Sequence, residues 1–291
     1  MIDNGVAGAN ISKEESSMKH YPRILFLLVA VCMLLASCGS SSNSASGSST
    51  TPTPTPVKLT VFAAASLTAA FGEIKTKYEA ANPNVTVTYN FGGSNTLVQQ
   101  IINGAPADVF ASADKKNMQK AVTPGLVNTP QTFVRNKVVV IIPANNPGNI
   151  TSLHDLAIKG IKIAVAGPSV PVGNYTLEVL NKMGLSSEYG PAYESAVKAN
   201  FVTQETSVSG VVQKVQLGEV DAGFVYVSDA FSAGSKVRSI DIPDQFNILA
   251  DYPIATVKTS TNASTAESFV QYVLSPDGQA ILTKYHFIPV G

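Results

Sequence analysis

The chain has 291 residues, 45% of them hydrophobic and 14% charged, which is enough to bury the core of one large or two medium-sized domains. Its 20 Lys and Arg residues balance 20 Asp and Glu residues, so we exclude nucleic acid as a partner. Both cysteines, Cys32 and Cys38, lie near the N-terminus, which excludes a disulfide framework from the rest of the chain. The three histidines, His20, His154 and His286, show no metal-ligand spacing.

Residues 18–38 predict a lipoprotein signal peptide. Basic residues at 19 and 23 precede an apolar run over 24–35 that is too short to span a bilayer. The run ends in Leu-Ala-Ser-Cys, which resembles the bacterial lipobox cleaved before a lipid-modified cysteine, here Cys38. We therefore expect residues 1–38 to be an N-terminal extension and signal peptide, with either Met1 or Met18 as the start. A plain transmembrane anchor is the alternative.

Residues 39–56 are rich in Gly, Ser, Thr and Pro and contain almost no side chain that can pack in a core. Such a composition predicts a disordered linker. Together with lipidation at Cys38, it predicts an extracytoplasmic protein that is lipid-anchored to the cell membrane.

From residue 57 onward, predicted strands and helices alternate. The expected strands are 58–63, 85–89, 108–113, 138–143, 161–166 and 222–227. The expected helices are 67–78, 97–102, 176–183 and 208–217, with Gly184 and Gly218 as C-caps of the last two. This order predicts an α/β fold with mostly parallel sheets, whose ligands bind beyond the carboxyl ends of the strands.

Four strand-to-helix turns have the composition of an anion site: 63–67, 91–96, 168–175 and 205–210. Small residues let a ligand approach the backbone, and Ser66 and Ser94 lie where helices begin. The beginning of a helix presents unpaired N–H groups and the positive end of the helix dipole, which favour an anion. The alternative is that both serines are ordinary N-caps.

Tyr226 lies at the carboxyl end of the apolar strand 222–227, before Ser228 and Asp229, either of which can cap the next helix. A tyrosine in this position can direct its hydroxyl into a cleft. The alternative is a packed tyrosine whose hydroxyl is satisfied inside the core.

The motifs VFAAASL (61–67) and GAPADVFASAD (104–114) resemble the signatures of bacterial periplasmic molybdate-binding proteins. The resemblance continues through SNTL (94–97), PVGNY (171–175) and VYVSDA (225–230), in order over 57–291. It implies a type II periplasmic-binding-protein fold with two α/β lobes joined by crossover strands near 133–138 and 246–254. Lobe 1 would comprise 57–135 plus 250–291, and lobe 2 would comprise 136–249.

The resemblance also implies which residues bind the ligand, a molybdate or tungstate oxyanion held without a cation. The hydroxyl and N–H groups of two serines, two backbone N–H groups and one tyrosine hydroxyl would supply the hydrogen bonds. The matching positions are Ser66, Ser94, Val172, Val208 and Tyr226. This chain has Gly93 and Asn95 where the family usually carries serines, and Asn95 is a possible extra donor.

Related binders complete the coordination of the metal centre with carboxylates, and Glu205 keeps that variant open. In either case the resemblance implies no cofactor, and molybdenum would be present only in the bound oxyanion. It also implies a monomer that delivers its ligand to the permease of an ABC importer.

Two other functions compete with this interpretation. The first is a binding protein for another tetrahedral oxyanion, such as sulfate. The second is a serine-dependent hydrolase with Ser66 or Ser94 as nucleophile, but the chain has no Gly-x-Ser-x-Gly motif. We expect His154 in a surface helix and His286 after the last helix, so neither offers the adjacent base that such a serine needs. We therefore do not expect an enzyme.

Overall fold

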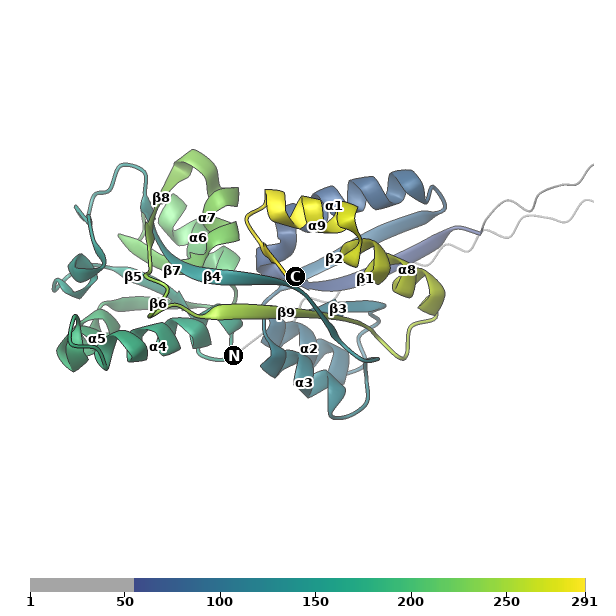
Figure 1. The fold of residues 1–291 in the computed structure, drawn as a ribbon, viewed down its shortest axis with the longest axis horizontal. Helices are drawn as coiled ribbons and strands as arrows, with labels where there is room; N and C mark the ends of the chain where they lie inside the picture. The colour runs from purple at the N-terminus through teal and green to yellow at the C-terminus, as the bar shows by residue number, and fades with distance from the viewer. Residues whose placement is uncertain (1–54, 291) are drawn as a thin grey trace, which may run out of the picture. The chain divides into compact units, whose positions relative to one another are not determined.

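The computed structural model describes residues 55–290. Strands and helices alternate along most of this range (Figure 1). The predicted signal peptide, Cys38 and nearly all of the predicted linker lie outside the described residues. Within residues 55–290, no helix has both the length and the apolar character needed to cross a bilayer.

Three parallel strands form one end of the sheet. Strand β1 (Val57–Ala64) lies between β2 (Val85–Gly92) and β3 (Val109–Ala111) and is parallel to both. The helices of this part of the sequence and of the C-terminal region are α1 (Thr68–Ala81), α2 (Ser94–Ile102), α3 (Lys115–Val122), α8 (Ala263–Leu274) and α9 (Pro276–Lys284). A short 3-10 helix, η1 (Ala65–Leu67), connects β1 to α1.

A second set of three parallel strands forms the other end. Strand β5 (Ile163–Ala166) lies between β6 (Phe201–Glu205) and β7 (Ala222–Tyr226). The helices of this part of the sequence are α4 (Pro171–Gly184), α5 (Gly190–Ala199), α6 (Val208–Gln216) and α7 (Val227–Ala233). It also contains the 3-10 helices η2 (Leu153–Ala157) and η3 (Gly234–Lys236).

Two long strands join the two sets, β4 (Gln131–Pro143) and β9 (Leu249–Thr256). Strand β9 is antiparallel to β3 and to the first half of β4, whereas the second half of β4 is antiparallel to β7 and β8 (Val237–Asp241). The short β10 (Ile288–Pro289) also pairs with β4. The α/β class is confirmed, but the expectation of mostly parallel pairing was wrong, because every pairing made by β4, β8, β9 and β10 is antiparallel.

The first helix shows how the core positions the loops. The side chains predicted to share one face of α1, among them Phe71, Ile74 and Tyr78, are buried. The ring of Phe71 lies 5.7 Å from that of Tyr89 and 6.1 Å from that of Phe133, measured between centroids. Burying one such side chain contributes about 1.5–3 kcal/mol. This packing fixes the start of α1 and therefore the η1 turn in front of it.

The start of α4 differs from the prediction. We expected a helix from Thr176, but α4 begins at Pro171, so residues 171–175 belong to its first turns instead of a loop. Proline is tolerated at the first helical position because the N–H group it lacks would have no partner there.

The end of α4 also differs. Gly184 was expected to be a left-handed C-cap, but it is the last helical residue, and the capping Leu185 has a right-handed conformation. A Cβ atom on Gly184 would lie 2.2 Å from Oε2 and 3.0 Å from Cβ of Glu194, so a larger residue here would require the Glu194 side chain to move. Gly218, by contrast, follows α6 with a φ of 69°, as predicted.

Candidate functional site

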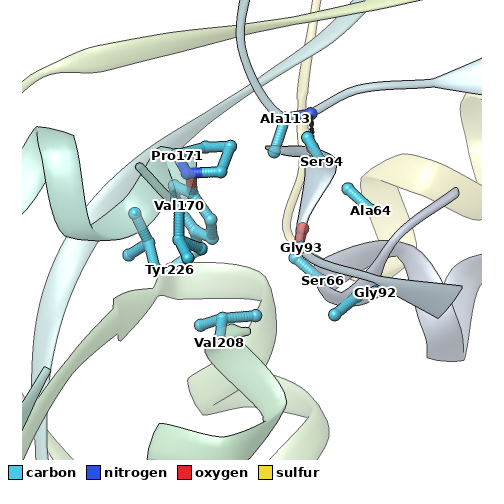
Figure 2. Close-up of a pocket in the computed structure, with 12 residues that line it drawn as sticks. Ala64, Ser66, Gly92, Gly93, Ser94, Ala113, Val170, Pro171, Val208 and Tyr226 are labelled. Carbon is cyan, nitrogen blue, oxygen red and sulfur yellow. Dashed lines mark hydrogen bonds between the residues drawn. The ribbon is translucent and has the colours of Figure 1, made fainter. Parts of the chain in front are cut away.

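Six strand ends converge on one small cavity. Its walls come from the segments that follow β1, β2, β3, β5 and β6 and from the last residue of β7. In Figure 2, Ser66, Gly93 and Ser94 face the cavity from one side, and Val170, Val208 and Tyr226 face it from the other. The lining residues are Ala64, Ala65, Ser66, Gly92, Gly93, Ser94, Ala113, Val170, Pro171, Val172, Val208 and Tyr226. All five predicted ligand residues are among them.

The size and charge of the cavity restrict what it can hold. Its volume is only about 10 Å³, far less than the roughly 300–1,000 Å³ of sites for organic ligands. None of the lining residues carries a charged side chain. The cavity therefore suits a small ligand that is recognised by neutral hydrogen-bonding groups.

Ser66 is not an N-cap, so the alternative given for this residue is wrong. It lies inside the 3-10 helix η1 and is 5% exposed, and the residue that precedes α1 is Leu67. Its Oγ atom is 3.0 Å from the hydroxyl of Tyr252 on β9. The hydroxyl of Ser66 is therefore held by another side chain at the edge of the cavity.

Ser94 is also not an N-cap. It is the first residue of α2, and Gly93 is the capping residue. The Oγ atom of Ser94 accepts a hydrogen bond from the backbone N–H of Ala113 at 3.0 Å (Figure 2). Because an N–H group can only donate, the hydroxyl proton of Ser94 remains available for a ligand.

The two valines contribute through their position in helices. Val172 is the second residue of α4 and Val208 is the first residue of α6, and both are buried. The first N–H groups of a helix have no acceptor within the helix. Both helices thus begin at the cavity with free amides and the positive end of their dipoles.

Tyr226 ends β7 and is 1% exposed. Its hydroxyl has no hydrogen-bond partner of good geometry among the described residues. Burial raises the pKa of this hydroxyl well above its ordinary value, and the nearby Tyr252 adds to the effect. A buried donor that stays protonated and unpaired costs free energy unless a ligand satisfies it.

Neither Ser228 nor Asp229 is the N-cap residue of α7, which is Tyr226. Asp229 acts from the third helical position, where its Oδ2 atom accepts the backbone N–H of Tyr226 at 3.1 Å. Burial raises the pKa of Asp229 to about 7. This carboxyl fixes the backbone of Tyr226 and so helps to position its ring.

Asn95 and Glu205, the two additional candidates, do not line the cavity. The Nδ2 atom of Asn95 donates to Oγ of Ser169 at 3.2 Å. The carboxylate of Glu205 accepts from the hydroxyl of Thr203 at 2.6 Å. The site within the described residues therefore has no carboxylate facing the ligand position.

The histidines do not support a hydrolase. His154 stacks on Tyr189 and His286 stacks on Phe231, with centroid distances of 4.6 and 4.2 Å, and neither lines the cavity. Residues 55–290 also contain no cluster of three or more His, Cys, Asp or Glu side chains that could hold a metal ion.

The sequence did not reveal two contributors. Ala113 and Tyr252 hold the hydroxyls of Ser94 and Ser66, but both come from segments distant in sequence. No local pattern indicates such partners. The only sequence signal is the tyrosine itself, in a strand that also carries Asp251 and Thr256.

Comparisons with known proteins agree with this geometry. A family model described as "Bacterial extracellular solute-binding protein" matches residues 59–288. The molybdate-binding protein ModA of Mycobacterium tuberculosis H37Rv is 38% identical over 230 residues, which cover 79% of this chain and 84% of that protein. The molybdate-binding protein ModA of Escherichia coli K12 is 36% identical over 243 residues, covering 79% and 88%.

A solved structure shows the same fold. The periplasmic molybdate-binding protein of Azotobacter vinelandii superposes with a TM-score of 0.69 at 23% identity. The match covers 80% of this chain and all of that one.

Proposed function

This chain belongs to the bacterial extracellular solute-binding protein family, and we propose that it captures molybdate or tungstate outside the cytoplasm and delivers it to the permease of an ABC importer. The observation that carries the proposal is the uncharged cavity whose buried Tyr226 hydroxyl has no partner among the described residues. Two similar proteins of comparable length are named for binding molybdate.

The oxyanion is held by hydrogen bonds alone. Ser66 and Ser94 each donate a hydroxyl and an N–H group, Val172 and Val208 each donate an N–H group, and Tyr226 donates its hydroxyl. These are about seven bonds to a charged acceptor, each contributing about 1.5–3 kcal/mol before the costs of binding. Their sum is compatible with sub-micromolar affinity, although such contributions are not additive.

Selectivity follows from the chemistry of the donors. A site made only of donors disfavours a ligand that carries its own proton, because two donors then face each other. Hydrogen phosphate is rejected for this reason. Sulfate has no proton near neutral pH, so the cavity must exclude it by size. The S–O bonds of sulfate are shorter than the metal–oxygen bonds of molybdate, and its oxygens therefore make stretched hydrogen bonds to the site.

The remaining features of the proposal concern the whole chain. Lobe 1 comprises 57–135 plus 250–291 and lobe 2 comprises 136–249, so that β4 and β9 are the crossovers and the ligand lies between the lobes. The pairing of β4 with β9 supports this division. The protein acts as a monomer and is tethered to the membrane by a lipid on Cys38.

Isothermal titration calorimetry of the purified protein with molybdate, tungstate, sulfate and phosphate tests the function. We expect sub-micromolar binding of molybdate or tungstate, and binding of sulfate and phosphate at least about a hundredfold weaker. Equal affinity for sulfate and molybdate would contradict the proposal and favour a general oxyanion binder.

A further inference from the structure

The hydroxyl of Tyr252 contacts Ser66, a residue of the proposed site, from outside the cavity. Tyr252 lies on β9 and is fully buried, and its Oη atom is 3.0 Å from Oγ of Ser66. It does not line the cavity. Its ring packs edge-on against Phe133, Tyr226 and Phe287, with centroids 5.6 to 6.5 Å away. Tyr252 is therefore fixed in place and acts on the cavity only through a neighbour.

The direction of this hydrogen bond follows from the surroundings of Tyr252. Ser66 is the only partner that its hydroxyl has within hydrogen-bond geometry among residues 55–290. If Ser66 donated to Tyr252, the phenolic proton would be left with the nearby Tyr226 hydroxyl, which is not a partner of good geometry, and a buried donor without a good partner costs about 1–3 kcal/mol. A phenol is also a stronger donor than an alkyl hydroxyl. Tyr252 therefore donates and Ser66 accepts.

This direction determines what Ser66 presents to a ligand. Once its oxygen accepts from Tyr252, the single proton of Ser66 is free to point into the site cavity, one of the two cavities that Ser66 lines. The same logic holds for Ser94, whose oxygen accepts from the N–H of Ala113. Both serines are thus set as donors, one by a backbone amide and the other by a tyrosine.

We propose that Tyr252 is a positioning residue that sets the selectivity of the site, because it forces the hydroxyl of Ser66 to donate and so excludes oxyanions that carry a proton. The inference rests on the proposed function. Without the Tyr252 hydroxyl, Ser66 is free to rotate and to offer a lone pair, which a protonated anion such as hydrogen phosphate can use.

The test is calorimetric titration of Tyr252→Phe with molybdate and phosphate at neutral pH. We expect molybdate affinity to fall about tenfold, which is the loss expected when one hydrogen bond to a charged ligand is no longer made. Phosphate affinity stays equal or rises, so the molybdate-to-phosphate ratio falls at least about tenfold. A purely structural role would weaken both anions equally and leave the ratio unchanged.

A double-mutant cycle adds a second readout. In the Ser66→Ala background, Tyr252→Phe should cost little further molybdate affinity, because the hydrogen bond that the Tyr252 hydroxyl makes is to Ser66. The matched control is Tyr78→Phe, which removes another buried hydroxyl, 3.2 Å from Oγ of Ser268, that has no contact with the site. Thermal unfolding of each ligand-free variant verifies that it folds.

Each outcome has a defined meaning. The role of Tyr252 would be overturned if Tyr252→Phe left the molybdate-to-phosphate affinity ratio unchanged. It would also be overturned if Tyr252→Phe cost the same molybdate affinity with and without the Ser66 hydroxyl. Either result would leave the proposed function intact. Failure of the unsubstituted protein to bind molybdate would overturn the proposed function itself, and this result is obtained before any variant is measured.

Discussion

At the scale of single residues, Asp229 is a buried carboxyl hydrogen-bonded to Tyr226, the tyrosine that we propose to bind the ligand. It accepts the N–H of Tyr226 and, together with Ser66, lines a second cavity beside the site. Because burial raises its pKa from 3.8 to about 7, the folded protein keeps a proton that the unfolded chain releases above about pH 4. The contribution of Asp229 to stability therefore declines as the pH rises from about 4 to about 7 and stays level above that.

The same carboxyl makes ligand binding depend on pH. A bound dianion disfavours a nearby carboxylate, so binding favours the protonated form of Asp229, and molybdate affinity should fall as the pH rises through about 7. Asp229→Asn keeps the size of the side chain but cannot ionise. We expect its affinity, measured by calorimetry at pH 6.5, 7.5 and 8.5, to be nearly constant. An equal pH dependence in both proteins would remove Asp229 from this role.

The residues of the site differ in how well the sequence predicts them. Ser66, Ser94 and Tyr226 could be predicted because a hydroxyl at a strand end is visible in the sequence. Val172 and Val208 act through backbone amides, which any residue provides, so only the resemblance pointed to them. Tyr252 could not be predicted, because its partner lies 186 positions away.

At the scale of elements, the turns of the site meet one another directly. A Cβ atom on Gly93 would lie 2.4 Å from the carbonyl oxygen of Thr206 and 2.7 Å from Oδ1 of Asn95. The turn between β2 and α2 therefore packs so closely against the turn between β6 and α6 that position 93 has room only for glycine.

Gly93→Ala should push these two turns apart. If the lobes close around the ligand, we expect molybdate affinity to fall about tenfold or more, while the melting temperature of the ligand-free protein changes little. The matched control is Gly72→Ala in α1, where a Cβ atom has no neighbour within 4 Å. It should stabilise the helix by about 0.5–1 kcal/mol and leave affinity unchanged. Unaltered affinity in Gly93→Ala would refute the contact as a requirement for binding.

The element predictions succeeded where local pattern decides structure. The apolar spacing of α1 and the alternation of β2 were visible because one face of each is buried. The start of α4 at Pro171 was missed because Pro, Gly and Asn in its first turns resemble a loop. Antiparallel pairing of β4 and β9 depends on contacts between segments more than 100 residues apart, which no local pattern encodes.

At the scale of the whole molecule, location is part of the function. A lipid on Cys38 would keep the protein near its importer without a membrane-spanning helix. We expect Cys38→Ser to abolish incorporation of a labelled fatty acid and to release the protein from the membrane fraction. Cys32→Ser, in the same predicted signal peptide, is the control and should retain the label. Labelling that persists in Cys38→Ser would show that this cysteine is not the anchor.

The central claim is that a dianion is held between two sets of strand ends by uncharged donors alone. Anomalous diffraction from a crystal grown with molybdate tests it most directly, because molybdenum marks its own position. We expect one peak in the cavity, at a position from which the oxyanion oxygens reach Ser66, Ser94 and Tyr226 by hydrogen bonds. A peak elsewhere, or one coordinated by the carboxylate of Glu205, would contradict it.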